Sequence, residues 1–215
     1  MESVYQPARK VGGDFFQIFS IGERGLLTVV GDVAGKGLPA AMHVSMLVGS
    51  ICGMAEGTHD PVVILRRLHE RLLGRTGGAF CTALSACISD DGCVTIANAG
   101  HLSSYLDGKE VEIPGALPLG IAGGGQYEPV NLELRPGSRL VFVSDGVVEA
   151  QNQAGELFGF DRARAISIEP AAAIVDAALR FGQSDDITVL TIQRLPVTDA
   201  PRHEKCERTL ASNLF

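Results

Sequence analysis

The sequence predicts an α+β fold in which two stacked, mostly antiparallel sheets are covered on the outside by helices. Short apolar segments with period-two alternation recur along the chain between turn residues, which is typical of strands. Asp91-Gly92 and Asp107-Gly108 separate such segments, and Asp-Gly favours the type I′ turns of hairpins. Helical periodicity is confined to two blocks of the chain. Because hairpins build antiparallel sheets, we expect antiparallel strand pairing. The two blocks of helices should then cover the outer faces of two stacked sheets.

The expected elements follow in chain order. Strands are predicted at residues 15–19, 26–30, 83–88, 94–97, 102–106, 111–113, 130–134, 140–143 and 187–192. Helices are predicted at residues 38–56, 61–73, 160–166 and 170–181. The second helix has an apolar stripe made of Val62, Leu65, Leu68, Leu72 and Leu73. Beyond residue 195 the chain is polar and aperiodic, so we predict one domain over residues 1–195 and a flexible tail over residues 196–215.

The composition excludes some classes of partner. The 215 residues include 18 Lys and Arg against 25 Asp and Glu, for a net charge of -7, and 46% are hydrophobic. A chain this apolar can bury a core, whereas its acidic surface repels nucleic-acid backbones and anionic lipid. We therefore expect neither nucleic acid nor a membrane as a partner.

Three features predict a cytoplasmic location. The N-terminus has no basic segment followed by an apolar one, as a secretory signal would. The five cysteines form no C-x-x-C pair and are expected to be free thiols. Residues 38–55 carry no charge and are just long enough to span a bilayer, but Pro39, His43 and several Ser and Gly residues favour a buried helix.

Aspartates lie at the ends of several predicted strands. Asp14 and Asp185 precede strands, and Asp32 and Asp145 follow them. A buried carboxylate is costly without a cation, and several together would repel one another and be partly protonated. Mg²⁺ and Mn²⁺ prefer such oxygen ligands, and the Val33 carbonyl offers another. The sequence therefore predicts a divalent-metal site. The alternative is that each aspartate acts separately as a helix cap or a turn former.

Glycines adjoin these acids. Gly12-Gly13 precedes Asp14, Gly31 precedes Asp32, and Gly146 follows Asp145. The absence of a side chain lets the backbone or a ligand approach closely. This is what a crowded site for metal and phosphate requires.

The segment from Gly31 to Ala40 must also be compared with nucleotide-binding motifs. A P-loop is excluded, because three residues separate Gly31 from Gly35-Lys36 and Gly37 follows. Gly35-x-Gly37-x-x-Ala40 fits a dinucleotide fingerprint, with Glu56 as the ribose ligand, but hairpins contradict the parallel sheet this requires. We expect instead a tight turn at Gly35 and Gly37, after which the helix N-terminus faces an anion.

Six motifs in one order resemble the SpoIIE/RsbU branch of the metal-dependent (PPM-type) protein phosphatases. They are PARKVGGDFF from Pro7, GDVAGKGLPAA from Gly31, ANAGH from Ala97, PLG from Pro118, SDGVVEA from Ser144 and SDDITV from Ser184. The resemblance covers residues 7–194 and implies a four-layer α-β-β-α sandwich with two Mn²⁺ or Mg²⁺ ions. It also implies hydrolysis of phosphoserine or phosphothreonine. The expected partners are a phosphorylated STAS-domain anti-anti-sigma protein as substrate and a second copy of the chain in a homodimer.

The resemblance also implies roles for individual residues. Asp32 would bridge the two ions, with the Val33 carbonyl on one of them. Asp145 and Asp185 would hold the other ion, so that Asp32, Asp145 and Asp185 form the catalytic set. Asp14 would bind more weakly, through water. The basic residues Arg9, Lys10 and Lys36 are candidate phosphate contacts.

The chain departs from the family pattern at two positions. It reads Gly35-Lys36-Gly37 where many relatives read Gly-His-Gly, and Ala34 stands where the wider family has a histidine. The general acid is therefore unassigned, with metal-bound water or Lys36 as candidates. The alternative function is a catalytically silent scaffold of the same fold that binds phosphoproteins.

Overall fold

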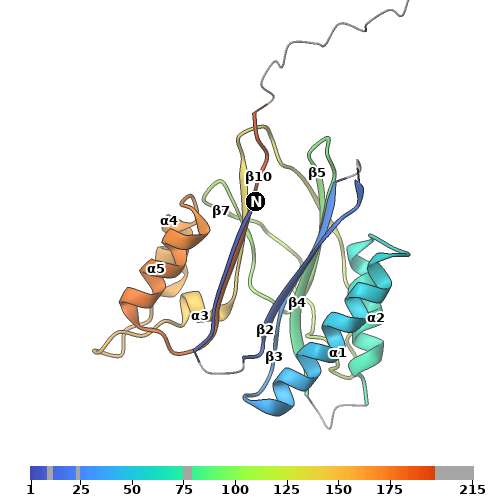
Figure 1. The fold of residues 1–215 in the computed structure, drawn as a ribbon, viewed down its shortest axis with the longest axis horizontal. Helices are drawn as coiled ribbons and strands as arrows, with labels where there is room; N and C mark the ends of the chain where they lie inside the picture. The colour runs from blue at the N-terminus through green and yellow to red at the C-terminus, as the bar shows by residue number, and fades with distance from the viewer. Residues whose placement is uncertain (9–11, 23–24, 75–78, 197–215) are drawn as a thin grey trace, which may run out of the picture.

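A computed structural model describes residues 1–8, 12–22, 25–74 and 79–196. Two five-stranded sheets stack face to face, and helices cover both outer faces (Figure 1). This arrangement confirms the predicted α+β class and its four layers. The proposed tail, apart from residue 196, lies outside the described residues.

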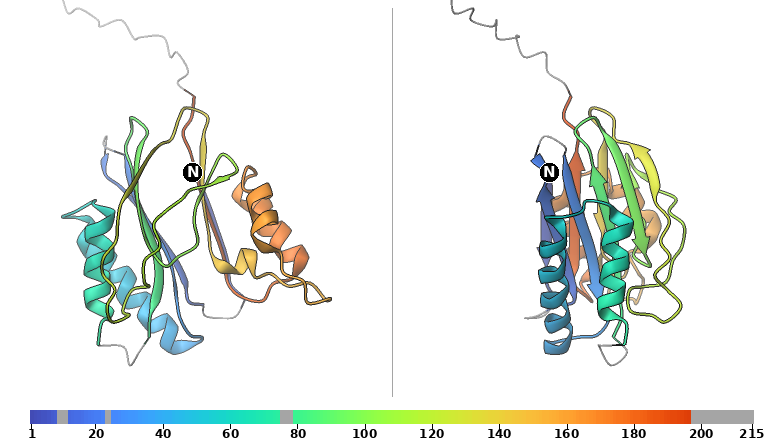
Figure 2. Two further views of the ribbon diagram at one scale, coloured as in Figure 1. Left: turned by 180° about the vertical axis from the view of Figure 1, so that it is seen from behind. Right: turned by 90° about the vertical axis from the view of Figure 1, so that its right-hand side faces the viewer.

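The first sheet contains most of the predicted hairpin strands. Its order is β2 (Asp14–Ser20), β3 (Leu26–Val33), β4 (Cys81–Ile88), β5 (Cys93–Ala99) and β8 (Val130–Glu133), and every neighbouring pair is antiparallel. Helices α1 (Leu38–Ala55) and α2 (Pro61–Leu72) lie side by side on its outer face (Figure 2). In α2, Leu65, Leu68 and Leu72 are buried, as the stripe predicts, but Val62 is only partly buried and Leu73 is exposed; Ile64, which the stripe did not include, is also buried.

The second sheet joins the two ends of the chain. Its order is β1 (Glu2–Gln6), β10 (Ile187–Gln193), β9 (Arg139–Val143), β6 (Tyr105–Leu106) and β7 (Lys109–Glu110), again antiparallel throughout. It is covered by α3 (Asp145–Val148), α4 (Gly159–Ile166) and α5 (Ala171–Gly182). Antiparallel pairing in both sheets contradicts the dinucleotide-binding alternative, which needs parallel strands.

Three apolar layers hold the sandwich together. One lies between the first sheet and α1 and α2, one between the second sheet and its helices, and one between the sheets. The layer between the sheets includes Val30, Leu84, Ile96, Phe142 and Leu190, all at most 1% exposed. Burial of this apolar surface is the main source of the fold's stability.

Some predicted elements differ from the structure. The predicted strands 102–106 and 111–113 are replaced by the two-residue strands β6 and β7, because the Asp107-Gly108 turn closes a very short hairpin with positive φ at both residues. Strand β1 and helix α3 were not predicted; β1 is mostly exposed and so lacks an apolar signal.

Helix α1 is only partly the buried helix that its composition predicts. Four of its apolar residues are buried against the sheet, namely Ala40, Leu47, Ile51 and Met54. Only 33% of the 18-residue segment Leu38–Ala55, however, is buried. By length and composition this helix could span a membrane; core helices of soluble proteins pass the same test.

Candidate metal centre

The alternation of two paired strands brings two carboxylates to the space between the sheets. On β2, Asp14 shares a face with Phe16 and Ile18, which pack in the layer between the sheets. On β3, Asp32 shares a face with Val30. The register pairs Asp14 directly with Asp32. Both acids therefore point inward at the same end of the sandwich.

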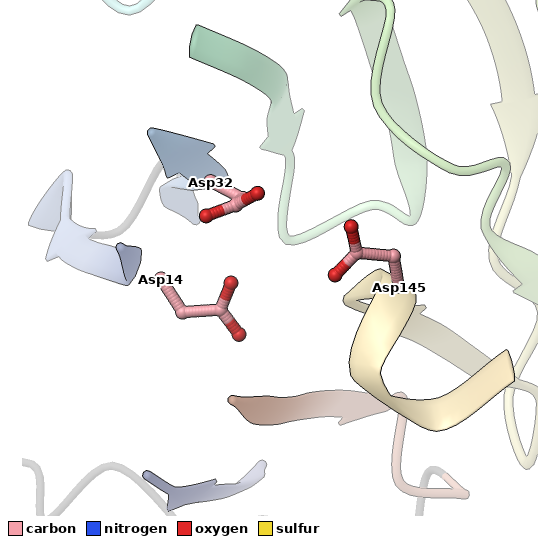
Figure 3. A group of neighbouring side chains, drawn as sticks. All are labelled: Asp14, Asp32 and Asp145. Atoms are coloured by element: carbon pink, nitrogen blue, oxygen red, sulfur yellow. The ribbon is translucent and has the colours of Figure 1, made fainter. Parts of the chain in front are cut away.

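The second sheet supplies the third carboxylate. Strand β9 ends at Val143, and α3 begins at Asp145 with Ser144 as its N-cap residue. The amide of Ser144 donates to the carbonyl of Thr188 on β10, which fixes this turn. One oxygen from each of Asp14, Asp32 and Asp145 lies within 4.8 Å of the others, and Figure 3 shows the three side chains converging.

The pKa values of these carboxyl groups are raised. Burial, followed by the charges of Asp145 and Asp185, raises the pKa of Asp32 to about 7. Burial also dominates the rise of the Asp14 pKa to about 8. The pKa of Asp145 is raised by burial and then by the charge of Glu149. Among the residues that the structure describes, no ion pair compensates the charge of Asp14, Asp32 or Asp145.

The donor set fits a hard divalent cation. All its atoms are carboxylate oxygens, which Mg²⁺ and Mn²⁺ prefer, and their spacing needs only small side-chain movements to meet one ion. Within the described part of the chain, the ion pair that reaches this end is that of Lys36 with Asp185. A cation at Asp14, Asp32 and Asp145 would offset both the burial and the mutual repulsion that raise their pKa values.

The glycines beside the acids allow the close approach that the sequence predicts. A Cβ on Gly13 would lie 2.7 Å from Oδ1 of Asp32 and 2.7 Å from the Val33 carbonyl oxygen. A Cβ on Gly146 would collide with the Asp186 carbonyl, and one on Gly12 with the Asp186 carboxylate. Any larger residue at these positions would force the strand ends apart. The Val33 carbonyl is thereby kept beside Asp32, where the sequence expects a ligand.

The adjacent aspartates 185 and 186 have different environments. Asp186 is 5% exposed, and its carboxylate accepts the amides of Ala8 and Gly13 at 2.9 and 3.0 Å. Asp185 is not within the three-carboxylate group, and its Oδ2 lies 3.2 Å from Nζ of Lys36. Asp186 therefore anchors the chain before β2, whereas Asp185 faces outward beside the centre.

The three basic candidates have separate outcomes. Lys36 lies at the centre, on Asp185. Arg9 and Lys10 fall outside the described residues. Their assignment as phosphate contacts stays a prediction.

The supporting roles of Thr188 and Asp186 were not predicted from the sequence. The hydroxyl of Thr188 donates to Oδ2 of Asp14 at 2.6 Å, and Asp186 holds Gly13. A signal was present, because Asp186 and Thr188 alternate in phase with Leu190 and Ile192, which face the other sheet. Two polar residues at the start of an inward-facing row indicate that the row ends at a polar site.

Known proteins are similar to this chain over most of its length. Phosphoserine phosphatase RsbU of Bacillus subtilis is 27% identical over 206 residues, covering 87% of this chain and 61% of RsbU. Protein IcfG of Synechocystis is 24% identical, covering 90% of this chain and 38% of IcfG. The chain thus spans less than two thirds of the length of these relatives. The SiaA-PP2C domain of Pseudomonas aeruginosa has the same fold, with a TM-score of 0.77, 24% identity and coverage of 89% of this chain and 84% of the domain.

The model of the family described as stage II sporulation protein E (SpoIIE) matches residues 22–195. That match contains most of both sheets, with Asp32, Asp145 and Asp185. The chain therefore belongs to the SpoIIE family, within the SpoIIE/RsbU branch of the PPM-type phosphatases.

Proposed function

We propose that this chain hydrolyses phosphoserine or phosphothreonine on a protein with the help of two Mn²⁺ or Mg²⁺ ions. The observation that carries the proposal is the meeting of Asp14, Asp32 and Asp145 within 4.8 Å, with raised pKa values and, in the described part of the chain, no ion pair to a basic side chain. Groups with strongly perturbed pKa values at one edge of a fold are typical of functional sites. The family gives the reaction class.

Each residue of the site has a proposed role that follows from its position. Bound divalent ions would activate a water molecule and neutralise the phosphoryl oxygens. Asp32, whose carboxylate meets those of Asp14 and Asp145, would bridge the two ions, with the Val33 carbonyl beside it. Asp145 would hold an ion from the second sheet, and Asp185 would join it there. Thr188 would orient the carboxylate of Asp14 through its hydrogen bond.

The shape of the site supports a protein substrate. The hollow next to the three carboxylates, which is lined by Gly13, Lys36 and Asp185 among others, has a volume of only about 20 Å³, too little to enclose a small ligand. The carbonyl of Phe80 accepts the amide of Ala34, so Phe80 lies next to the loop that carries Lys36. Its side chain is exposed there, with the residue 39% accessible to solvent. A shallow site with apolar surface nearby suits a phosphate carried on a folded partner. In line with the substrate that the family resemblance implies, we propose a phosphorylated STAS-domain protein.

The experiment measures phosphate release from a phosphoserine protein in Mn²⁺. We expect activity to disappear with chelator and to fall by about a thousandfold or more in Asp32→Asn, because the central ligand is lost. Asp161→Asn is the matched control, since Asp161 is 95% exposed on α4. Activity that survives both the chelator and Asp32→Asn would contradict the proposal.

The silent scaffold makes a different prediction. Such a protein has no need to keep a group of buried, mutually repelling carboxylates, because they cost stability without an ion. Titration calorimetry with Mn²⁺ separates the two functions. Stoichiometric binding that Asp32→Asn weakens supports the phosphatase, whereas the absence of binding in the folded wild type supports the scaffold.

A further inference from the structure

Lys36 is paired with a residue that the proposed function assigns to a metal. Its Nζ lies 3.2 Å from Oδ2 of Asp185, and the two side chains are 57% and 43% exposed. The ammonium group therefore stands where a divalent ion on Asp185 would have to bind. This pairing is specific to a chain that has lysine at this position.

The loop that carries Lys36 is shaped by glycine. Gly35 and Gly37 have φ values of 116° and 76°, a region that other residues rarely adopt, and a Cβ at either would meet nothing within 4 Å. The loop is tied at its start, where Ala34 donates its amide to the carbonyl of Phe80, and at its end, where α1 begins. Its backbone thus presents Lys36 from a fixed base, while the four-carbon side chain remains free to change partner.

Asp185 is held in the orientation that meets Lys36. Its Oδ1 accepts the amide of Asp186 at 2.9 Å, and its carbonyl accepts from the side chain of Gln183 at 3.1 Å. Both carboxylate oxygens are therefore engaged. Yet Asp185 is close enough for its charge to raise the pKa of both Asp32 and Asp145. It borders the three-carboxylate group without contributing an oxygen to it.

We propose that Lys36 competes with the divalent ion for Asp185. In the metal-free protein the ammonium group neutralises this carboxylate. An ion shared by Asp145 and Asp185 must displace the ammonium group, because two cations cannot occupy the same oxygen without strong repulsion. The displaced Lys36 is then free to contact the phosphate of the substrate. The inference rests on the proposed function, since it concerns the second of the two ions.

The first test measures Mn²⁺ binding by titration calorimetry on the full chain. In Lys36→Met, which keeps the length of the side chain but not its charge, we expect the site at Asp145 and Asp185 to bind about three- to tenfold more tightly. The site at Asp14 and Asp32 should change by less than about twofold. Lys36→Arg keeps a cation on Asp185 and should resemble the wild type. Lys109→Met is the matched control, because Lys109 is exposed on β7 in the other sheet.

Salt provides a second signature of competition between exposed charges. Raising ionic strength from about 0.05 M to about 0.5 M should reduce the difference in Mn²⁺ affinity between the wild type and Lys36→Met, because salt screens the ion pair. A role in packing alone would leave that difference unchanged.

The released ammonium group is tested with inorganic phosphate as the probe. In saturating Mn²⁺, phosphate should bind Lys36→Met about three- to tenfold more weakly than it binds the wild type, because a charge-assisted contact is lost. Lys36→Arg should restore most of the affinity.

The outcomes separate this inference from the function on which it rests. If the wild type binds two Mn²⁺ ions and Lys36→Met binds them with unchanged affinity, Lys36 does not compete and the inference is wrong, while the proposed function stands. If the folded wild type binds no Mn²⁺, both are wrong. Tighter Mn²⁺ binding at Asp145 and Asp185 in Lys36→Met, together with weaker phosphate binding, supports the inference in full.

Discussion

At one end of the sandwich, β2, β3 and β10 reach carboxylates; at the other, the same strands border an apolar cavity of about 390 Å³. The acidic end comprises Asp14, Asp32, Asp145, Asp185 and Asp186. The apolar end is lined by Ile18, Leu26, Ile88, Leu134 and Ile192, among others. Along β2 the inward-facing row runs from Asp14 to Ile18 within a single strand. One row of alternating residues therefore serves stability at one end and chemistry at the other.

The two ends differ in what they contribute to folding. Apolar side chains buried at the cavity wall stabilise the sandwich in any buffer. At the acidic end, ionised Asp14 and Asp32 oppose folding until a cation binds, because their carboxyl groups are desolvated and repel their neighbours. The following predictions test this division, beginning with the largest expected effect.

Leu134→Ala should damage stability without damaging the site. Leu134 is 1% exposed at the apolar end, and its truncation should lower the free energy of unfolding by about 3 kcal/mol, as expected for a large-to-small change in a core. Denaturant titration measures the loss. Because the metal ligands are at the other end of the strands, Mn²⁺ affinity in the folded protein should stay within about twofold of the wild type. A large change in affinity would contradict the independence of the two ends.

Asp186→Ala should show that one acid of the acidic end acts structurally. Its removal leaves the amide of Ala8 and the buried amide of Gly13 without their acceptor, at a cost of about 2 kcal/mol. Asp185→Ala is the comparison, since Asp185 makes an exposed ion pair and its removal should cost less than about 1 kcal/mol. Equal losses in the two variants would show that the contrast between the neighbours is wrong.

The acidic end should also make stability depend on pH in a characteristic direction. The pKa of Asp14 is about 8 in the folded protein against 3.8 for the free group, so the folded state keeps a proton that the unfolded state has lost. The metal-free protein should therefore lose stability as pH rises from about 4 to about 8. Thermal denaturation in chelator should show this decline, and Asp14→Asn should flatten it. With Mn²⁺ the trend should reverse, because the ion binds the ionised carboxylates.

The smallest effect is expected for Lys36→Met in chelator. An ion pair that is about half exposed contributes little, so the free energy of unfolding should change by less than about 0.5 kcal/mol. Its stability in Mn²⁺, in contrast, should exceed that of the wild type, because tighter binding adds to the stability of the folded state. A large loss in chelator would mean that Lys36 supports the fold itself.

The sequence was sufficient to predict the features that depend on the periodicity of apolar residues and on the order of motifs along the chain. Alternation predicted the sheets, and the position of Asp14, Asp32 and Asp145 at strand ends predicted that they would meet. The partner of Asp185 could not be predicted in this way. Lys36 comes from a loop 149 residues away in the sequence, and Oδ2 of Asp185 can be neutralised either by a metal ion or by an ammonium group. The short hairpin of β6 and β7 was misplaced because an apolar run continues into Val111, which is buried without being in a strand.

The raised pKa values of Asp14 and Asp32 have a consequence for how ion uptake is measured. Near neutral pH these groups are partly protonated, so loading the site exchanges hydrogen ions for metal. The buffer binds the released protons. The heat recorded in a calorimeter therefore includes the ionisation enthalpy of the buffer. Titrations in two buffers of different ionisation enthalpy would count the protons released, and that number should fall as pH rises above about 8.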